Sequence, residues 1–86
     1  MLPIRKLLSR IRWDREFGQG EFEIGYYDRV TGKIVRVPFR ELVIEPEERE
    51  RFGVLDQEGV YRRLPFHRVR EVHRNGECIW QRPATQ

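Results

Sequence analysis

A gapless pattern that occurs twice, 27 residues apart, constrains this chain more than any other feature. Its shared positions are glycine, arginine, an aliphatic residue, proline, phenylalanine and a second aliphatic residue. The first copy comprises Gly32, Arg36, Val37, Pro38, Phe39 and Leu42, and the second comprises Gly59, Arg63, Leu64, Pro65, Phe66 and Val69. Only the pair after the phenylalanine differs, being Arg40-Glu41 in one copy and His67-Arg68 in the other. The shared positions indicate architecture, and the differing pair indicates a candidate function.

Hydrophobic periodicity predicts one helix followed by short strands. Apolar residues recur at helical spacing after Pro3, so residues 1–12 are expected to form an amphipathic helix. From residue 21 the apolar period changes to two, and Asn75-Gly76 is the strongest hairpin signal. Pro38 should mark the end of a strand or a sheet edge, because proline cannot donate to the ladder. Residues 45–51 are expected to form either a short helix or a loop.

These elements predict an α+β domain: an N-terminal amphipathic helix packed on a curved antiparallel sheet, or partly open small barrel, of about six short strands. The length fits a single domain over 1–86, with a strand-rich body at 21–82 and a frayed tail at 83–86. The repeat further suggests a pseudo-symmetric pair of strand-hairpin-strand-turn units. The expected aromatic core residues are Phe22, Phe39, Phe52, Phe66 and Trp80. Tyr26 and Tyr27 should face opposite sides of one strand.

Composition restricts what can stabilise this fold. Cys78 is the only cysteine, so an internal disulfide is excluded, and no metal-ligand spacing is present. Packing and surface charge must therefore supply the stability. The chain has 15 arginines against 2 lysines. This bias suits bidentate phosphate binding, and it also suits the surface ion pairs of a thermophilic protein. The two interpretations are compatible.

Charge is segregated along the chain. The formal net charges of residues 1–40, 41–58 and 59–86 are +4, −5 and +4. A uniform coat for nonspecific polyanion binding is therefore not expected, although folding could bring the two basic arms together. On the predicted helix, basic side chains form either a solvated face or a phosphate-tracking edge; they are Arg5, Lys6, Arg10 and Arg12. No apolar run approaches the ~20 residues of a membrane span, and a cytoplasmic protein is expected.

Residues that could carry catalysis are few. His67, His73 and Cys78 are the potential metal ligands, but a predicted turn and arginines separate the histidines. Ser9 and Cys78 lie in ordinary helix and strand patterns, without the base and orienting group that a nucleophile needs. We therefore expect no enzyme activity, no metal and no small-molecule cofactor.

Binding is better supported, by a cluster within residues 61–74. Its members are Tyr61, Arg62, Arg63, His67, Arg68, Arg70, His73 and Arg74. Arginine and histidine can hold phosphate, and an exposed tyrosine can stack on a base. The alternative is a solvated surface paired with the acidic segment, because strand alternation puts Tyr61 and Arg63 on one face and Arg62 on the other. His67 and Arg68 are the strongest candidates, since they break the repeat.

The assembled pattern resembles a known family. The residues that carry the resemblance are Leu7-Leu8 to Ile11 with Trp13-Asp14, Tyr27-Asp28-Arg29, the run from Leu64 to Val72, and Gly76 with Ile79-Trp80. They are similar to those of a small, mostly archaeal family of stand-alone proteins whose domain is proposed to recognise RNA ends bearing a cyclic phosphate. The resemblance covers nearly the whole chain. It implies that His67, Arg68, Asp28 and Arg29 contact the ligand. Phe66 stands where a tyrosine would fit equally well, which removes a possible hydroxyl contact.

Two hypotheses of different classes follow. The first is a non-enzymatic RNA-binding module that grips phosphate with His67 and Arg68, supported by Arg70 and Arg29, with Tyr61 as an aromatic contact. The second is a protein-interaction module, an accessory subunit of a larger assembly. A phosphodiesterase ranks below both, because it would need two convergent histidine motifs. The expected partner is RNA, with a protein as a further possibility, and no membrane.

Overall fold

One α-helix and six antiparallel strands make up the part of the protein that a computed structural model describes, residues 3–56 and 58–82. The elements are α1 (Ile4–Trp13), β1 (Phe22–Asp28), β2 (Lys33–Pro38), η1 (Phe39–Glu41), β3 (Arg51–Leu55), β4 (Tyr61–Pro65), η2 (Phe66–Arg68), β5 (Val69–Arg74) and β6 (Glu77–Gln81). Both η elements are single turns of 3-10 helix. The predicted α+β class with an N-terminal helix is confirmed.

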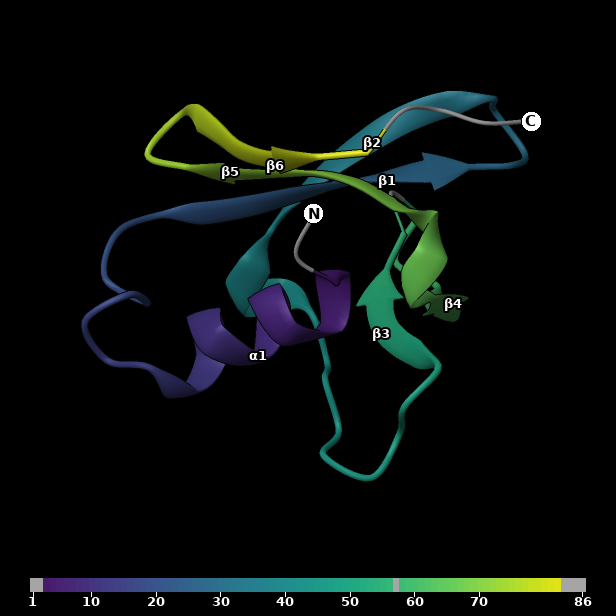
Figure 1. The fold of residues 1–86 in the computed structure, drawn as a ribbon. Coiled ribbons are helices and arrows are strands. Elements are labelled where there is room, and N and C mark those ends of the chain that lie inside the picture. The colour runs from purple at the N-terminus through teal and green to yellow at the C-terminus, as the bar shows by residue number, and fades with distance from the viewer. Residues whose placement is uncertain (1–2, 57, 83–86) are drawn as a thin grey trace.

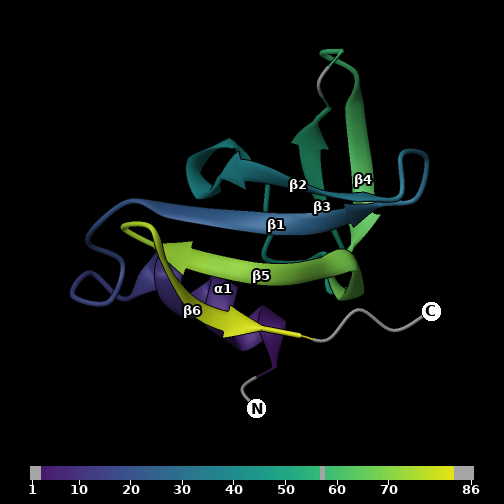
Figure 2. The same ribbon diagram turned by 90° about the horizontal axis from the view of Figure 1, so that it is seen from above.

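The strands form two hydrogen-bonded sets. Four of them make a sheet in the order β2-β1-β5-β6, and β3 pairs with β4 in a separate hairpin. The helix α1 covers one face of the four-stranded sheet (Figure 1), and the strands of the β3–β4 hairpin run across the direction of the sheet strands (Figure 2). Within the described residues the sheet is open, so the strands do not close into a barrel.

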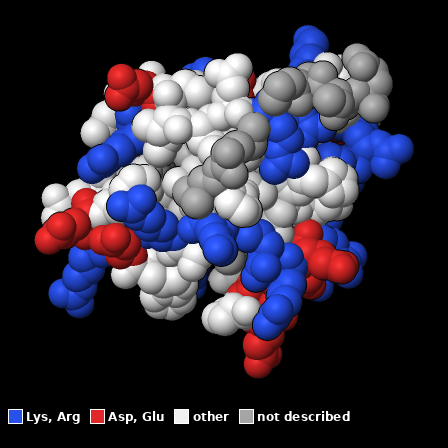
Figure 3. All heavy atoms as spheres, viewed as in Figure 1, with Lys and Arg blue, Asp and Glu red and all other residues white. Residues whose placement is uncertain are grey.

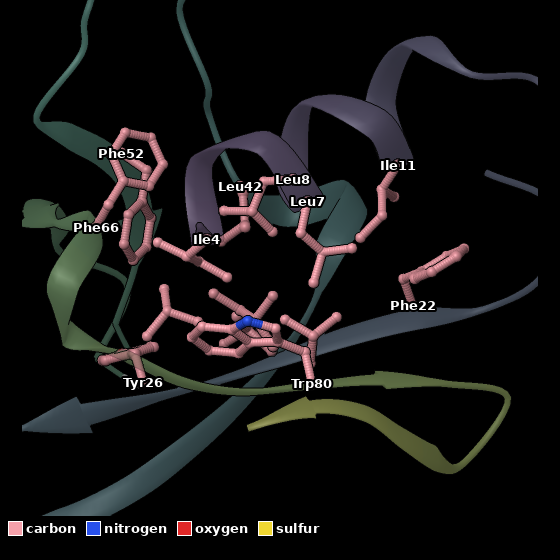
Figure 4. Close-up of a cluster of buried hydrophobic side chains, with 14 of the residues drawn as sticks. Ile4, Leu7, Leu8, Ile11, Phe22, Tyr26, Leu42, Phe52, Phe66 and Trp80 are labelled. Carbon is pink, nitrogen blue, oxygen red and sulfur yellow. The ribbon is translucent and has the colours of Figure 1, made fainter. Parts of the chain in front are cut away.

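The hydrophobic core lies between α1, the sheet and the β3–β4 hairpin (Figure 4). The helix contributes its apolar stripe, which is Ile4, Leu7, Leu8 and Ile11. Phe52 of β3 and Phe66 of η2 have ring centroids 5.5 Å apart and close one end of the core. Each fully buried side chain of this size contributes roughly 1.5–3 kcal/mol through removal of apolar surface from water. The predicted aromatic core is confirmed for four of its five members, while Phe39 is half-buried and packs against the core.

Turn chemistry follows the sequence closely. Asn75 and Gly76 have φ values of 51° and 86°, the left-handed pair that a tight hairpin between β5 and β6 requires. Pro38 ends β2, and β2 is an edge strand, as the missing N–H predicts. Residues 45–51 contain turns and bends and then the start of β3, so of the two expected forms the loop is the one observed.

Both copies of the repeated pattern adopt the same local backbone. Pro38 and Pro65 each end a strand, with φ of −62° in both and ψ of 140° and 144°. A single 3-10 turn follows each proline, and the N–H of the next residue returns to the phenylalanine carbonyl in both cases. Pseudo-symmetry of the two larger units stays a prediction.

The predicted boundaries differ from the observed ones by a few residues. The helix expected at 1–12 is observed at Ile4–Trp13, and the strands of the body expected at 21–82 extend from Phe22 to Gln81. The tail expected at 83–86 lies outside the described residues, as do residues 1–2 of the helix prediction. In the part of the chain described, no helix has the length and apolar character needed to cross a lipid bilayer.

Candidate functional site

An open cleft of about 630 Å³ lies where the end of the β1–β2 hairpin faces the β3–β4 hairpin and η2. Its charged lining residues are three arginines and three acids: Arg29, Arg62, Arg68, Asp28, Asp56 and Glu58. Its remaining lining residues are Tyr26, Tyr27, Val30, Thr31, Val35 and Leu64. Segments that are distant in sequence therefore bring basic and aromatic side chains to one concave surface.

Two of the cleft's carboxylates are held by the hairpin loops. Asp28 Oδ1 accepts the N–H of Val30 at 2.9 Å. Asp56 Oδ1 accepts the N–H groups of Glu58 and Val60, each at 2.9 Å, and its Oδ2 accepts Arg62 Nε at 2.7 Å. The hydrogen bond from Arg62 is the main reason that the pKa of Asp56 lies below its ordinary value of 3.8, and the two backbone N–H groups lower it further. Arg62 is therefore engaged by the loop.

Arg29 and Arg68 differ from Arg62 in this respect. Arg29 is exposed and Arg68 is half-buried, and both line the cleft. Among residues 3–56 and 58–82, neither has an acidic side chain within ion-pair distance. Planar guanidinium groups without an internal acceptor are suited to bind the oxygens of a phosphate. The cleft thus offers two arginines to an anion although its formal charges balance.

The cleft also has an aromatic wall. Tyr26 is buried, and burial foremost, with Asp28 and Asp56 nearby, raises the pKa of its phenol. The phenol therefore stays protonated at neutral pH and is able to donate a hydrogen bond. Tyr27 is half-buried on the opposite face of β1, with its ring 5.9 Å from the Arg70 guanidinium. The expected opposite orientation of the two tyrosines agrees with this burial.

The structure separates His67 and Arg70 from the cleft lining. The His67 side chain is exposed, and its carbonyl oxygen accepts hydrogen bonds from Nη1 of Arg70 and from Nη1 of Arg82, the latter at 3.2 Å. Arg68 lies next in the same turn but lines the cleft. Of these three candidates, only Arg68 therefore lines the cleft, and His67 and Arg70 lie outside its lining.

Tyr61 lies away from the cleft. Its ring covers Gly53 on β3, where any larger side chain would collide with it. Arg63, two residues further along β4, donates from Nη2 to Glu48 at 2.6 Å and lies 3.7 Å from Glu45. The predicted alternation is thus observed, with Arg62 on the cleft face and the acidic segment paired with Arg63 as the alternative interpretation expects.

Some cleft residues were absent from the sequence-based candidates. Tyr27 was named as one of two adjacent tyrosines and within the run Tyr27-Asp28-Arg29 that carries the resemblance, but not as a ligand contact. Arg62 was named only as a member of the basic cluster. Strand alternation separates Arg62 from Tyr61 and Arg63 in the sequence analysis, but it does not show which of the two faces lines the cleft.

The Asn75-Gly76 turn predicts the β5–β6 hairpin, but an unshifted register would place Gln81 opposite Arg70. The irregularity between Val72 and His73 shifts the pairing by one residue, so Arg82 lies beside Arg70.

Basic side chains also cover α1. Figure 3 shows lysines and arginines across the middle of the face that carries the helix, with acidic side chains nearer its edges. Arg10 is 3.7 Å from Asp14 and 4.1 Å from the Phe17 ring centroid, and Arg12 is 5.1 Å from the Trp13 ring centroid. Trp13 itself is 65% exposed. This surface is a secondary basic region outside the cleft.

The histidines lie in different environments. His73 is buried on β5, and its Nε2 is 2.9 Å from Glu71 Oε1, whereas His67 is exposed on η2. In the described ranges, no group of three or more histidine, cysteine or acidic side chains is arranged to hold a metal ion.

The fold and cleft define a small α+β domain with two arginines available to an anion. The chain matches the family described as the MJ1316 RNA cyclic group end recognition domain over residues 1–82, and it belongs to that family. RNA is accordingly the partner class, and the protein is an RNA-binding module. Comparisons with curated proteins and with solved structures gave no match.

Proposed function

We propose that this protein binds RNA ends that carry a cyclic phosphate, without turning them over, and that the cleft holds the end. The observation that carries the proposal is the convergence of Arg29 and Arg68, two arginines without an acidic partner in the described chain, on one concave surface. They come from the β1–β2 loop and from η2. The description of the family supplies the class of RNA end.

The balance of charge in the cleft suits a cyclic phosphate better than a linear one. A cyclic phosphodiester carries a single negative charge, whereas a terminal phosphomonoester has a second pKa near 6 and is largely dianionic at neutral pH. Asp28, Asp56 and Glu58 line the same cleft as the arginines. These carboxylates oppose the second charge, so the site accepts the monoanion and disfavours the dianion.

The remaining candidates have supporting roles in this proposal. Tyr27 offers an aromatic face to the terminal base, as proteins commonly do for unstacked RNA bases. Asp28 shapes the loop that presents Arg29, through its bond to Val30. His67, exposed on the same turn as Arg68, contacts RNA just outside the cleft. Tyr61 covers Gly53, away from the cleft. Any contact that Tyr61 makes with RNA is therefore with nucleotides further from the bound end.

Binding without turnover is supported by the arrangement of the histidines. A phosphodiesterase acting on cyclic ends would use two convergent general acid-base groups. Here His67 is exposed on η2, while the ring of His73 is buried on β5 and engaged by Glu71. Incubated RNA should therefore keep its cyclic end, and formation of a linear phosphate by purified protein would contradict this part of the proposal.

A second candidate function, docking on a protein assembly, is favoured by one observation. The β3–β4 hairpin exposes three large apolar side chains: Leu55 at 55%, Val60 at 49% and Tyr61 at 50%. Grouped exposed apolar residues often mark protein interaction sites. A pull-down with and without ribonuclease separates the two functions, since a partner retained after ribonuclease favours the docking role.

The direct test titrates the protein with short RNAs that differ only at the 3′ end: cyclic phosphate, linear phosphate or hydroxyl. We expect the cyclic end to bind at least about tenfold more tightly than either other end. The hydroxyl end lacks the charged hydrogen bonds to phosphate, worth about 1.5–3 kcal/mol, and the cleft carboxylates repel the second charge of the linear phosphate. Arg68→Ala and His67→Ala should weaken binding, Arg68→Ala more strongly. Arg40→Ala is the matched control, since Arg40 occupies the position of His67 in the other copy of the repeat.

Salt dependence gives an independent reading. Nonspecific phosphate contact makes affinity fall steeply with salt whatever the end group. Specific recognition should preserve the ratio between cyclic and hydroxyl ends as salt is raised. Equal affinity for all three RNAs, or no change in either variant, would sink the proposal.

A further inference from the structure

Arg70 and Arg82 converge on one acceptor beside η2. Both donate from Nη1 to the carbonyl oxygen of His67, and the backbone N–H of Arg82 donates to the Arg70 carbonyl at 2.8 Å. The two positively charged guanidinium groups that share this carbonyl oxygen repel each other, and a bound anion would relieve this repulsion. The pairing of β5 with β6 brings the two arginines together.

No acidic side chain in the described ranges forms an ion pair with either arginine. Arg70 Nε is buried and has no hydrogen-bond partner among the described residues. Burial, and secondly the nearby Arg70, lower the pKa of Arg82, which nevertheless remains protonated at neutral pH. An excess of positive charge and an unused donor thus occur at the same place.

This pair is connected to the cleft through two residues. The Arg70 guanidinium is 5.9 Å from the ring of Tyr27, and Tyr27 lines the cleft. His67, whose carbonyl joins the two arginines, immediately precedes Arg68, which also lines the cleft. An RNA strand whose 3′ end occupies the cleft can therefore pass Tyr27 and reach Arg70 and Arg82 within a short distance.

We propose that Arg70 and Arg82 form a second anion site, which binds the backbone phosphodiester on the 5′ side of the terminal nucleotide. The inference rests on the proposed function, because it takes the strand's end to lie in the cleft. Arginine forks hold phosphate oxygens bidentately, and phosphate contacts commonly fix the register of a nucleic acid. The smallest ligand that fills both sites is a dinucleotide with a cyclic end.

The test removes one charge from the RNA and one from the protein. Two trinucleotides with cyclic ends are compared, one of them with an uncharged methylphosphonate at the linkage next to the terminal nucleotide. A 2′-O-methyl group on the penultimate sugar of both keeps that linkage stable. The proteins are wild type, Arg82→Gln, Arg70→Gln and Arg15→Gln. Arg15 is exposed in the turn after α1, and Arg15→Gln removes an equal charge elsewhere.

We expect the neutral linkage to weaken binding to wild type and to Arg15→Gln about tenfold, the size of a charged hydrogen bond to phosphate. Arg82→Gln and Arg70→Gln should each bind the two RNAs with affinities within about twofold of each other. In these variants the phosphate charge has already lost its arginine partner, so removing that charge from the RNA has little further effect. An equal loss in all four proteins, or no loss in wild type, overturns the second site. The comparison within wild type holds even if a variant folds poorly.

A third RNA separates this inference from the proposed function. The same trinucleotide with a 3′-hydroxyl reports preference for the cyclic end. If wild type prefers the cyclic end but the arginine substitutions do not change the effect of the neutral linkage, the Arg70–Arg82 site alone is overturned. If wild type binds the cyclic and hydroxyl ends equally, the proposed function is overturned. If it binds none of the RNAs, both the proposed function and the second site are overturned.

Discussion

The two proline-phenylalanine turns share a backbone and differ in what the two residues after the phenylalanine do. After Pro38, η1 presents Arg40 and Glu41 to solvent, and among the described residues neither lines the cleft. After Pro65, η2 places Arg68 in the cleft, and its His67 carbonyl joins Arg70 to Arg82. The backbone that the two copies share is therefore a structural support, and the two positions at which the copies differ determine the chemistry.

The turns also differ in how deeply they enter the core. Phe66 is 6% exposed and packs on Phe52, whereas Phe39 is half-buried at the margin of the core. The residue that closes each turn is buried in both cases, as Leu42 or Val69. The turn that carries the candidate site is thus the more firmly anchored one, which suits a residue such as Arg68 that must hold a fixed position.

The largest expected effect of this difference is on stability. Phe66→Ala should lower the free energy of unfolding by about 3–5 kcal/mol, because it removes a buried ring from the contact with Phe52. Phe39→Ala should cost roughly half as much or less, since part of that ring already meets solvent. Denaturant unfolding of both variants checks the order. Equal losses would show that the two turns are anchored alike.

The next effect is on affinity for RNA ends. Arg68→Gln should weaken binding of a cyclic-ended RNA about tenfold or more, through loss of a charge-assisted hydrogen bond. Glu41→Gln, at the equivalent position of η1, should change it less than about twofold. Fluorescence anisotropy with one labelled RNA measures both. If Glu41→Gln instead strengthened binding by about as much as Arg68→Gln weakened it, general charge, and not the position in η2, would control binding.

A smaller effect concerns the loop between β3 and β4, which carries Asp56 and precedes η2. Arg62 and two backbone N–H groups lower the pKa of Asp56, so Asp56 stabilises the fold above its ordinary pKa of 3.8, and this contribution disappears as pH falls through the lower folded value. Asp56→Asn should therefore lower Tm modestly at pH 7 and have little effect near pH 2. Thermal unfolding across this range provides the measurement, and a Tm difference that is independent of pH would contradict the account.

Much of the fold could be predicted because local signals agreed. Helical spacing from Ile4 to Ile11, the Asn75-Gly76 turn and the proline at the end of β2 each have a direct physical meaning. Two separate sets of strands could not be predicted, because periodicity shows which face of a strand is buried but not which strand is its neighbour.

The site was less accessible from sequence for the same reason. Arg29 and Arg68 are 39 positions apart and meet only because the two hairpins face each other. The dense cluster at 61–74 dispersed over several surfaces, since neighbours on a strand point in opposite directions. Arg63 pairs with Glu48, and Arg74 donates to the Gln19 carbonyl. Proximity in the chain was therefore a poor guide to convergence.

The most direct test of the central claim observes the arginine side chains themselves. Nitrogen-15 NMR of the Nε–H groups, assigned by single arginine-to-lysine substitutions, would be recorded during titration with a nucleoside 2′,3′-cyclic monophosphate at mildly acidic pH. The account predicts saturable shifts at Arg29 and Arg68 and constant positions for Arg40 and Arg15. Shifts confined to the arginines of α1, with Arg29 and Arg68 unchanged, would contradict it.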